Sequence, residues 1–161
     1  EVIQQCKASL ERLHNCRDNI DFALRNAAGE AGDASKAFRA QLEARRQQFI
    51  DAMDDDLNTA DAIAALFELS RDVNSYLAAV RPRADVEAAA ALFDELCGVL
   101  GLLYDRTGKG DVDAEIERLI EERQAARKAR DFATADRIRD ELKAQGILLE
   151  DTPQGVKWKR M

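Results

Sequence analysis

The stretch VEAAAALFDELCGVLGLLY, residues 86–104, has the apolar spacing of a helix and carries apolar side chains on more than one face of it. One row comprises Val86, Ala90, Phe93, Cys97, Leu100 and Tyr104, and the other comprises Leu92, Leu96, Val99 and Leu103. A helix that is apolar over so much of its circumference must be covered by neighbours on several sides. The stretch therefore predicts a helix of a bundle, and the most buried one of the set.

Three amphipathic helices are predicted before it, because apolar residues recur at steps of three and four. The stripes are Ile3, Cys6, Leu10, Leu13, Cys16, Ile20 and Leu24; then Phe38, Leu42, Phe49 and Met53; then Ile63, Leu66, Phe67, Val73, Leu77 and Val80. A loop with two glycines, residues 26–33, separates the first two helices, and Arg81-Pro82 is expected to stop the third. Four helices joined by modest loops favour an antiparallel bundle over residues 1–104.

An acidic run, Asp54-Asp55-Asp56, precedes the third helix, which Asn58 or Thr59 is expected to cap. A calcium-binding loop is the obvious alternative for such a run. That reading places Thr59 where an EF-hand needs glycine and Ala65 where it needs a bidentate glutamate. The run is therefore interpreted as a negatively charged helix start, and no metal site is predicted.

A second, smaller domain is expected at residues 113–161, after a linker at 105–112 that is rich in glycine and polar residues. Apolar residues at Ile116, Leu119 and Ile120 begin a fifth helix, and a sixth, with its stripe from Phe132 to Leu142, is expected to end at Gly146. Residues 147–150, 151–155 and 156–159 then have the pattern of strand, turn and strand. The predicted fold class is mainly α: a helix bundle followed by a helical hairpin with a C-terminal β-hairpin.

Composition excludes several classes of protein. The chain has 161 residues, 31 acidic and 24 basic, for a formal net charge of -7. No stretch approaches the roughly 18 apolar residues of a membrane span, and no basic-then-apolar leader opens the chain. We therefore expect a cytoplasmic protein without membrane contact; because it starts at Glu1, we expect a processed chain or a piece of a longer one.

No catalytic residue is predicted. The chain has no phosphate-binding glycine loop, no nucleophile elbow and no CxxC pair. Cys6, Cys16 and Cys97 are expected to be buried free thiols in a reducing compartment. The single histidine, His14, lacks a partner at catalytic or metal-ligating spacing and is expected at the surface.

Charge is unevenly distributed along the chain. Residues 1–110 hold 19 acidic and 13 basic residues, whereas residues 111–161 hold 12 and 11. Near the end of the chain the cations gather at Arg123, Arg127, Lys128 and Arg130, and at Lys157, Lys159 and Arg160 around Trp158. Cations beside an aromatic ring suit single-stranded nucleic acid, which needs neutralised phosphates and a stacking surface. A solvated helix face with Trp158 closing a small core is the alternative.

Several segments resemble bacterial cysteinyl-tRNA synthetases. The stretch AMDDDLNT, residues 52–59, is similar to the start of a helix in their DALR domain, and ASLERL, residues 8–13, to the start of that domain. The tail is closer: IERLIEERQAARKAR (116–130), DFATADRIRD (131–140) and GILLEDTPQG (146–155) look like the end of the same enzymes. The resemblance implies a DALR bundle of the class I synthetase anticodon-binding type, followed by a small anticodon-recognition domain.

The resemblance also implies site residues and partners. Arg127, Asp136 and Asp151 fall on the family's anticodon-reading positions, and Phe132 falls where the family often has tryptophan. Phe132 keeps a stacking face but lacks the indole donor. Candidate contacts to the RNA backbone are Arg123, Lys128, Arg130, Lys157 and Lys159. The implied partners are cysteine tRNA and an N-terminal catalytic domain.

That catalytic domain, with its HIGH and KMSKS signatures, ATP and zinc, has no counterpart in this sequence, so no cofactor is expected here. The expected function is therefore tRNA recognition within a cysteine–tRNA ligase, without catalysis by this part alone. A helical protein–protein interaction module is the alternative, and a stand-alone hydrolase or metal enzyme is a third reading that no group of residues supports. Trp158 is expected to serve the fold rather than the anticodon.

Overall fold

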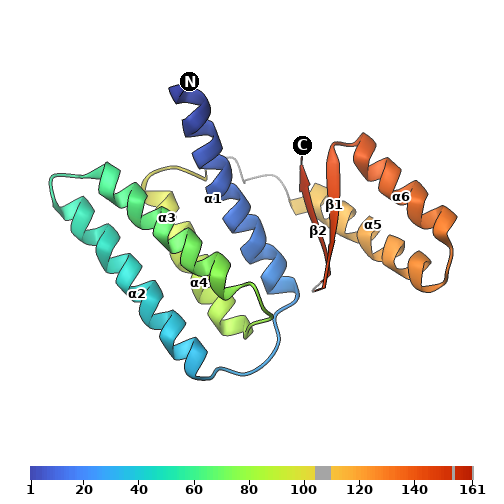
Figure 1. Cartoon of the computed structure of the whole chain (residues 1–161), viewed down its shortest axis with the longest axis horizontal. Coiled ribbons are helices and arrows are strands. Elements are labelled where there is room, and N and C mark those ends of the chain that lie inside the picture. The colour runs from blue at the N-terminus through green and yellow to red at the C-terminus, as the bar shows by residue number, and fades with distance from the viewer. Residues whose placement is uncertain (104–109, 154, 161) are drawn as a thin grey trace. The chain divides into compact units, whose positions relative to one another are not determined.

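The chain divides into two compact units, Glu1–Tyr104 and Asp105–Met161, here called the N-terminal and the C-terminal unit (Figure 1). The structure is a computed structural model that describes residues 1–103, 110–153 and 155–160. Tyr104 and residues 105–109 of the expected linker lie outside the described residues. Within the described part, no helix is long and apolar enough to cross a membrane.

Four helices form the N-terminal unit: α1 (Val2–Arg25), α2 (Asp33–Asp54), α3 (Thr59–Tyr76) and α4 (Arg83–Val99). Helices α3 and α4 pack against each other, and each also packs against both α1 and α2. The expected helix bundle is confirmed (Figure 1). Its core contains Leu13, Cys16, Ile20, Phe38, Leu42, Phe49, Leu66, Leu69, Val73, Val86, Phe93, Leu96 and Cys97.

Helix α4 ends earlier than the apolar pattern predicts. Its last helical residue is Val99, which is 59% exposed. Gly101 adopts a positive φ of 65°, and the amide of Leu102 donates to the carbonyl of Cys97 while that of Gly101 donates to Gly98. This pair of hydrogen bonds is a Schellman motif, which closes a helix through a left-handed glycine. The prediction that the helix runs to residue 104 was wrong because a glycine ends it locally.

The apolar stripe of α1 is only partly buried. Leu13, Cys16 and Ile20 lie in the core, whereas Ile3 is 83% exposed and Cys6 is exposed. Burial of Cys6 was therefore a wrong prediction. The two other cysteines are buried as expected, and burial raises the pKa of the Cys97 thiol to about 12.

The turn between α2 and α3 takes up part of the acidic run. Asp54 is the last residue of α2, and Asp56 and Leu57 follow with positive φ angles of 49° and 58°. Asn58 caps α3 as predicted, because its side chain accepts from the amide of Asp61 at 3.2 Å. Helix α3 ends at Tyr76, ahead of the predicted stop at Arg81-Pro82, so Val80 lies outside it and is 49% exposed.

The C-terminal unit contains α5 (Gly110–Lys128), α6 (Phe132–Ala144) and the antiparallel strands β1 (Ile147–Thr152) and β2 (Gly155–Arg160). Gly146 has a φ of 78° and follows α6 as expected. The expected helical hairpin with a β-hairpin is confirmed, with two differences. Helix α5 already begins at Gly110, inside the expected linker, and the strands pair up to Thr152 and Gly155, which shortens the turn.

The small core of this unit joins its helices to its hairpin. Ile116, Leu119, Ile120, Ile138, Leu142 and Ile147 are buried together, and Trp158 packs against them from β2. This packing supports the expected structural role of Trp158. Helix α6 contacts both α5 and β1, so it links the position of α5 to that of the first strand.

Candidate nucleic-acid interface

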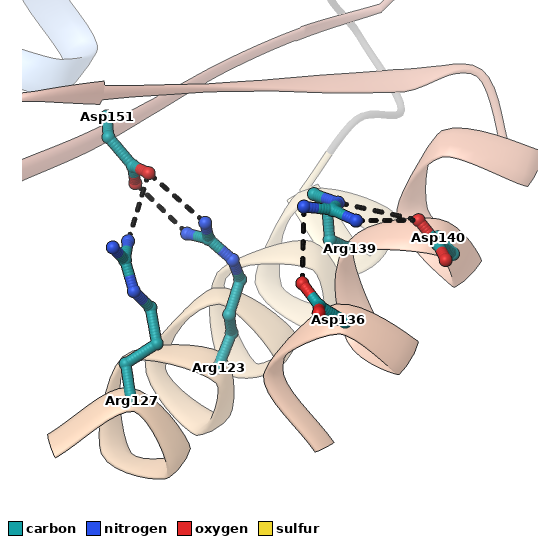
Figure 2. Close-up of polar contacts among 6 residues, drawn as sticks. All are labelled: Arg123, Arg127, Asp136, Arg139, Asp140 and Asp151. Atoms are coloured by element: carbon teal, nitrogen blue, oxygen red, sulfur yellow. Dashed lines mark hydrogen bonds and ion pairs between the residues drawn. The ribbon is translucent and has the colours of Figure 1, made fainter. Parts of the chain in front are cut away.

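The Asp151 carboxylate accepts hydrogen bonds from two arginines of α5 (Figure 2). Arg123 donates through Nη1 to Oδ1 at 3.0 Å and through Nη2 to Oδ2 at 3.1 Å. Arg127 donates through Nη1 to Oδ2 at 3.0 Å. The two arginines are four residues apart, a spacing that places them on the same side of a helix. We call Arg123, Arg127 and Asp151 the arginine–aspartate cluster.

The three members differ sharply in exposure. The side chain of Arg123 is 8% exposed, whereas those of Arg127 and Asp151 are 51% and 50% exposed. Arg123 is thus an internal support, and the other two side chains form the open surface. The hydrogen bonds from Arg123 lower the pKa of Asp151, against a smaller opposing effect of burial, and the charge of Arg127 adds to the lowering. The carboxylate is therefore ionised at neutral pH.

The cluster retains hydrogen-bonding capacity toward solvent. A carboxylate has about four acceptor positions and a guanidinium about five N–H donors. Asp151 uses three acceptor positions for its arginines, and Arg127 uses one donor for Asp151. The exposed surface thus offers about one acceptor on Oδ1 beside about four donors. Adjacent donors and acceptors match the edge of an unpaired base.

Asp136 lies apart from this cluster, on α6 (Figure 2). Its carboxylate is 63% exposed and pairs with Arg139 at 3.2 Å, and Arg139 also donates to Asp140 at 3.4 Å. Among the described side chains, no hydrogen bond or ion pair joins Asp136 to Asp151. The sequence prediction named both aspartates, but the contacts join only Asp151 to the predicted arginines.

Phe132 is the first residue of α6 and is 61% exposed. Arg130, two residues before it, has a positive φ of 62°, and Asp131 caps α6 by accepting from the amide of Thr134 at 3.1 Å. The tight connection from α5 to α6 thus leaves the Phe132 ring at the surface, where a base is able to stack on it.

The other predicted cations occupy different environments. Lys128 and Arg130 are exposed at the end of α5, and Lys157 is half-buried on β2, opposite Glu150. The side chain of Lys159 lies outside the described ones. Arg123 is not at the surface where the prediction placed it, because it is buried against Asp151. Its spacing to Arg127 was the available signal that both arginines share a face of α5.

Each unit matches the model of a known domain family. Residues 48–104 match the family model of the DALR domain, and residues 109–158 match that of the cysteinyl-tRNA ligase anticodon binding domain. The chain is also 47% identical to a cysteine–tRNA ligase of Symbiobacterium thermophilum over 161 residues, which cover 99% of this chain and 34% of that protein. It is 48% identical to the cysteine–tRNA ligase of an Exiguobacterium species over 162 residues, which cover 100% of this chain and 34% of that protein.

The chain belongs to the cysteine–tRNA ligase family and carries the DALR and anticodon-binding domains of its C-terminal part. It spans about a third of the length of these curated relatives. Within the described residues, no group of three or more His, Cys, Asp or Glu side chains is placed to hold a metal ion.

Proposed function

We propose that this chain is the tRNA-recognition part of a cysteine–tRNA ligase and that its C-terminal unit reads the anticodon of cysteine tRNA. The observation that carries the proposal is the arginine–aspartate cluster, an exposed donor–acceptor surface with a buried support. It lies in a domain whose family is described as anticodon-binding.

Each residue of the surface has a distinct chemical role in this proposal. Arg127 donates to a base or a phosphate, and Asp151 accepts from a base amine or ring N–H. Phe132 offers a stacking face, and Asp136 provides a second acceptor on α6. Arg123 positions Asp151 rather than contacting RNA, because it is buried.

Cations around this surface contribute affinity that does not depend on base sequence. Lys128, Arg130, Lys157 and Lys159 are the candidates for contacts with the phosphate backbone. The N-terminal unit contacts the anticodon stem in the same proposal. Attachment of cysteine with ATP, and any zinc that selects the cysteine, are assigned to a catalytic domain elsewhere in the parent ligase, which acts in the cytoplasm.

A binding experiment tests the anticodon assignment. Cysteine tRNA and the same tRNA with a different anticodon are titrated into the chain at two salt concentrations. Cysteine tRNA is expected to bind more tightly, and Arg127→Gln and Asp151→Asn each to reduce this preference by about 1–3 kcal/mol, the usual value of a good base contact. Equal binding of the two tRNAs at both salt concentrations would contradict the proposal.

Arg118→Gln is the matched control for this experiment. Arg118 lies on the same helix, is 66% exposed and pairs only with its helical neighbour Glu115 among the described residues. The Arg118→Gln variant loses the same charge as Arg127→Gln, so it measures the effect of net charge alone. An equal loss of tRNA preference in this variant would show that Arg127 acts as a general positive charge and reads no base.

A further inference from the structure

A groove of about 570 Å³ lies between α1 and α3 in the N-terminal unit. Arg12 and Asn15 line it from α1, and Phe67, Arg71 and Asn74 line it from α3. It belongs to a different unit from the arginine–aspartate cluster. Most of the residues that line it have polar side chains, among them two with guanidinium groups and two with side-chain amides.

The two arginines of the groove differ from five other arginines of the unit. No carboxylate lies within ion-pair distance of Arg12 or Arg71 in the described part of the chain. Five other arginines of the unit are each paired with an acidic side chain: Arg17 with Asp94, Arg39 with Asp85, Arg45 with Asp72, Arg46 with Glu95 and Arg83 with Glu87. A groove that keeps two uncompensated guanidinium groups in an otherwise acidic unit is suited to an anion.

The groove also restrains one of its two arginines. The guanidinium carbon of Arg12 lies 5.0 Å from the centroid of the Phe67 ring, a cation–π contact that restricts its orientation. Asn74 accepts from the Nδ2 of Asn19 at 2.9 Å through its carbonyl oxygen, so its own amide N–H groups are available as donors. The one carboxylate that lines the groove, Glu68, pairs with Arg45.

We propose that this groove binds the phosphodiester backbone of RNA through Arg12 and Arg71. Guanidinium forks match phosphate oxygens, and neutral amides donate to phosphate and to ribose hydroxyls without reading sequence. An acidic peptide is the weaker match, because protein interfaces need an apolar core, and the only large apolar side chain in the lining, Phe67, already contacts Arg12. The proposal rests on the proposed function, in which the N-terminal unit contacts an RNA stem, and it names the groove and the two arginines that make the contact.

The test uses the whole chain and an RNA hairpin that has a duplex stem but no cysteine anticodon. Binding is measured over a series of salt concentrations for the native chain, for the double variant Arg12→Gln/Arg71→Gln and for the double variant Lys36→Gln/Arg83→Gln. The control removes the same charge from two exposed side chains that are paired with Asp33 and Glu87. Circular dichroism and a thermal melt verify that each variant is folded.

The groove variant is expected to bind the hairpin at least tenfold more weakly at low salt. The slope of log affinity against log salt is expected to fall by roughly 1 to 2, as for two lost phosphate contacts. In the control variant, the logarithm of the affinity is expected to change by less than half of its change in the groove variant. Equal losses in both variants, or binding unchanged in the groove variant, would overturn the proposal.

A second arm separates this site from the anticodon site and from a protein partner. With the two tRNAs used above, the groove variant is expected to lose affinity equally for both and to keep any preference between them. Absence of anticodon preference in the native chain would therefore contradict the proposed function while leaving the groove test intact. Binding of a poly-glutamate peptide that depends on Arg12 and Arg71, without such binding of the hairpin, would overturn the RNA assignment.

Discussion

Arg123 holds Asp151 through two parallel hydrogen bonds of 3.0 and 3.1 Å, although 28 residues separate them in the chain. The guanidinium is buried on α5 and the carboxylate is half-exposed on β1, so the pair links the helical hairpin to the β-hairpin. A bidentate pair restricts both side chains more than a single contact does. This pair sets the direction in which the Asp151 carboxylate faces solvent.

Replacing Arg123 by methionine is expected to lower the free energy of unfolding of the C-terminal unit by about 1–2 kcal/mol. The loss is that of hydrogen bonds to a charged group, reduced because Asp151 is half-exposed and regains water. Urea unfolding followed by the fluorescence of Trp158 measures it. Arg118→Met, an exposed control on the same helix, is expected to change stability by less than about 0.5 kcal/mol. Equal changes in both variants would contradict the supporting role of Arg123.

Asp85 is expected to make the stability of the N-terminal unit depend on pH. Its carboxylate is fully buried and accepts from the Tyr76 hydroxyl at 2.6 Å and from Arg39 Nε at 2.9 Å. Burial by itself raises the pKa of Asp85, but hydrogen bonds from Ser35, Tyr76 and Arg39 outweigh it and leave the pKa below the ordinary 3.8. The native state thus binds this proton more weakly than the unfolded state does.

The stabilisation from a lowered carboxyl pKa is complete above the unfolded pKa and is lost as pH falls through the folded one. Asp85→Asn is expected to cost about 2 kcal/mol at pH 7, because Tyr76 and Arg39 lose a charged acceptor. The difference between the native chain and the variant is expected to shrink below pH 3.8. Urea unfolding from neutral to acid pH measures it, and a difference that grows on acidification would refute the expectation.

Arg130 occupies a position that favours glycine. Its φ is 62°, and the amide of Asp131 donates to Ala126 while that of Arg130 donates to Arg127, as in a Schellman motif. Arg130→Gly is expected to stabilise the C-terminal unit by about 1 kcal/mol, because the left-handed conformation costs a non-glycine residue roughly that amount. Thermal unfolding measures the change, and a destabilised variant would contradict the argument.

The same position separates stability from RNA binding. Both Arg130→Gly and Arg130→Asn remove the charge, and asparagine tolerates the left-handed region better than most residues. If Arg130 contacts a phosphate, both variants lose affinity for tRNA to a similar extent, whatever their stability. A loss of tRNA affinity in Arg130→Gly alone would show that the backbone conformation, and not the charge, causes the loss.

Phe132 is expected to matter for RNA and not for the fold. Because its ring is 61% exposed, Phe132→Ala is expected to change the free energy of unfolding by less than about 0.5 kcal/mol. Loss of a stacked base is expected to cost about 1–3 kcal/mol in tRNA binding, and Phe132→Trp is expected to preserve it. A leucine variant that binds as tightly as the native chain would show that the contact is merely apolar.

Much of the fold is readable from local patterns. The spacing of Leu13, Cys16 and Ile20, and that of Ile116, Leu119 and Ile120, predicted helices that the structure contains. Asn58 caps α3 and Gly146 follows α6 in a left-handed conformation, as predicted, because these preferences belong to one or two residues. Helix ends were less predictable, since the stripe of α4 continues past the glycine that ends it.

The candidate site was predicted in part. The resemblance pointed to Arg127 and Asp151, which are in contact, but not to Arg123 as the buried side chain that holds Asp151. The apolar stripe of α1 likewise predicted burial at Ile3 and Cys6, which the bundle leaves exposed. Periodicity shows which residues share a face but not whether another element covers that face.

The amino-acid sequence alone determined the helical character, the caps, the hairpin at the end and the family, because each of these depends on neighbouring residues or on a contiguous motif. Tertiary structure decided which charged side chains form ion pairs within the protein and which remain available to a ligand. Arg123 is buried against Asp151 of β1, whereas Arg12 and Arg71 have no ion pair among the described residues, because Glu68, the carboxylate that lines their groove, pairs with Arg45. Contacts between residues far apart in the chain depend on how the elements pack, and a local sequence pattern does not contain that information.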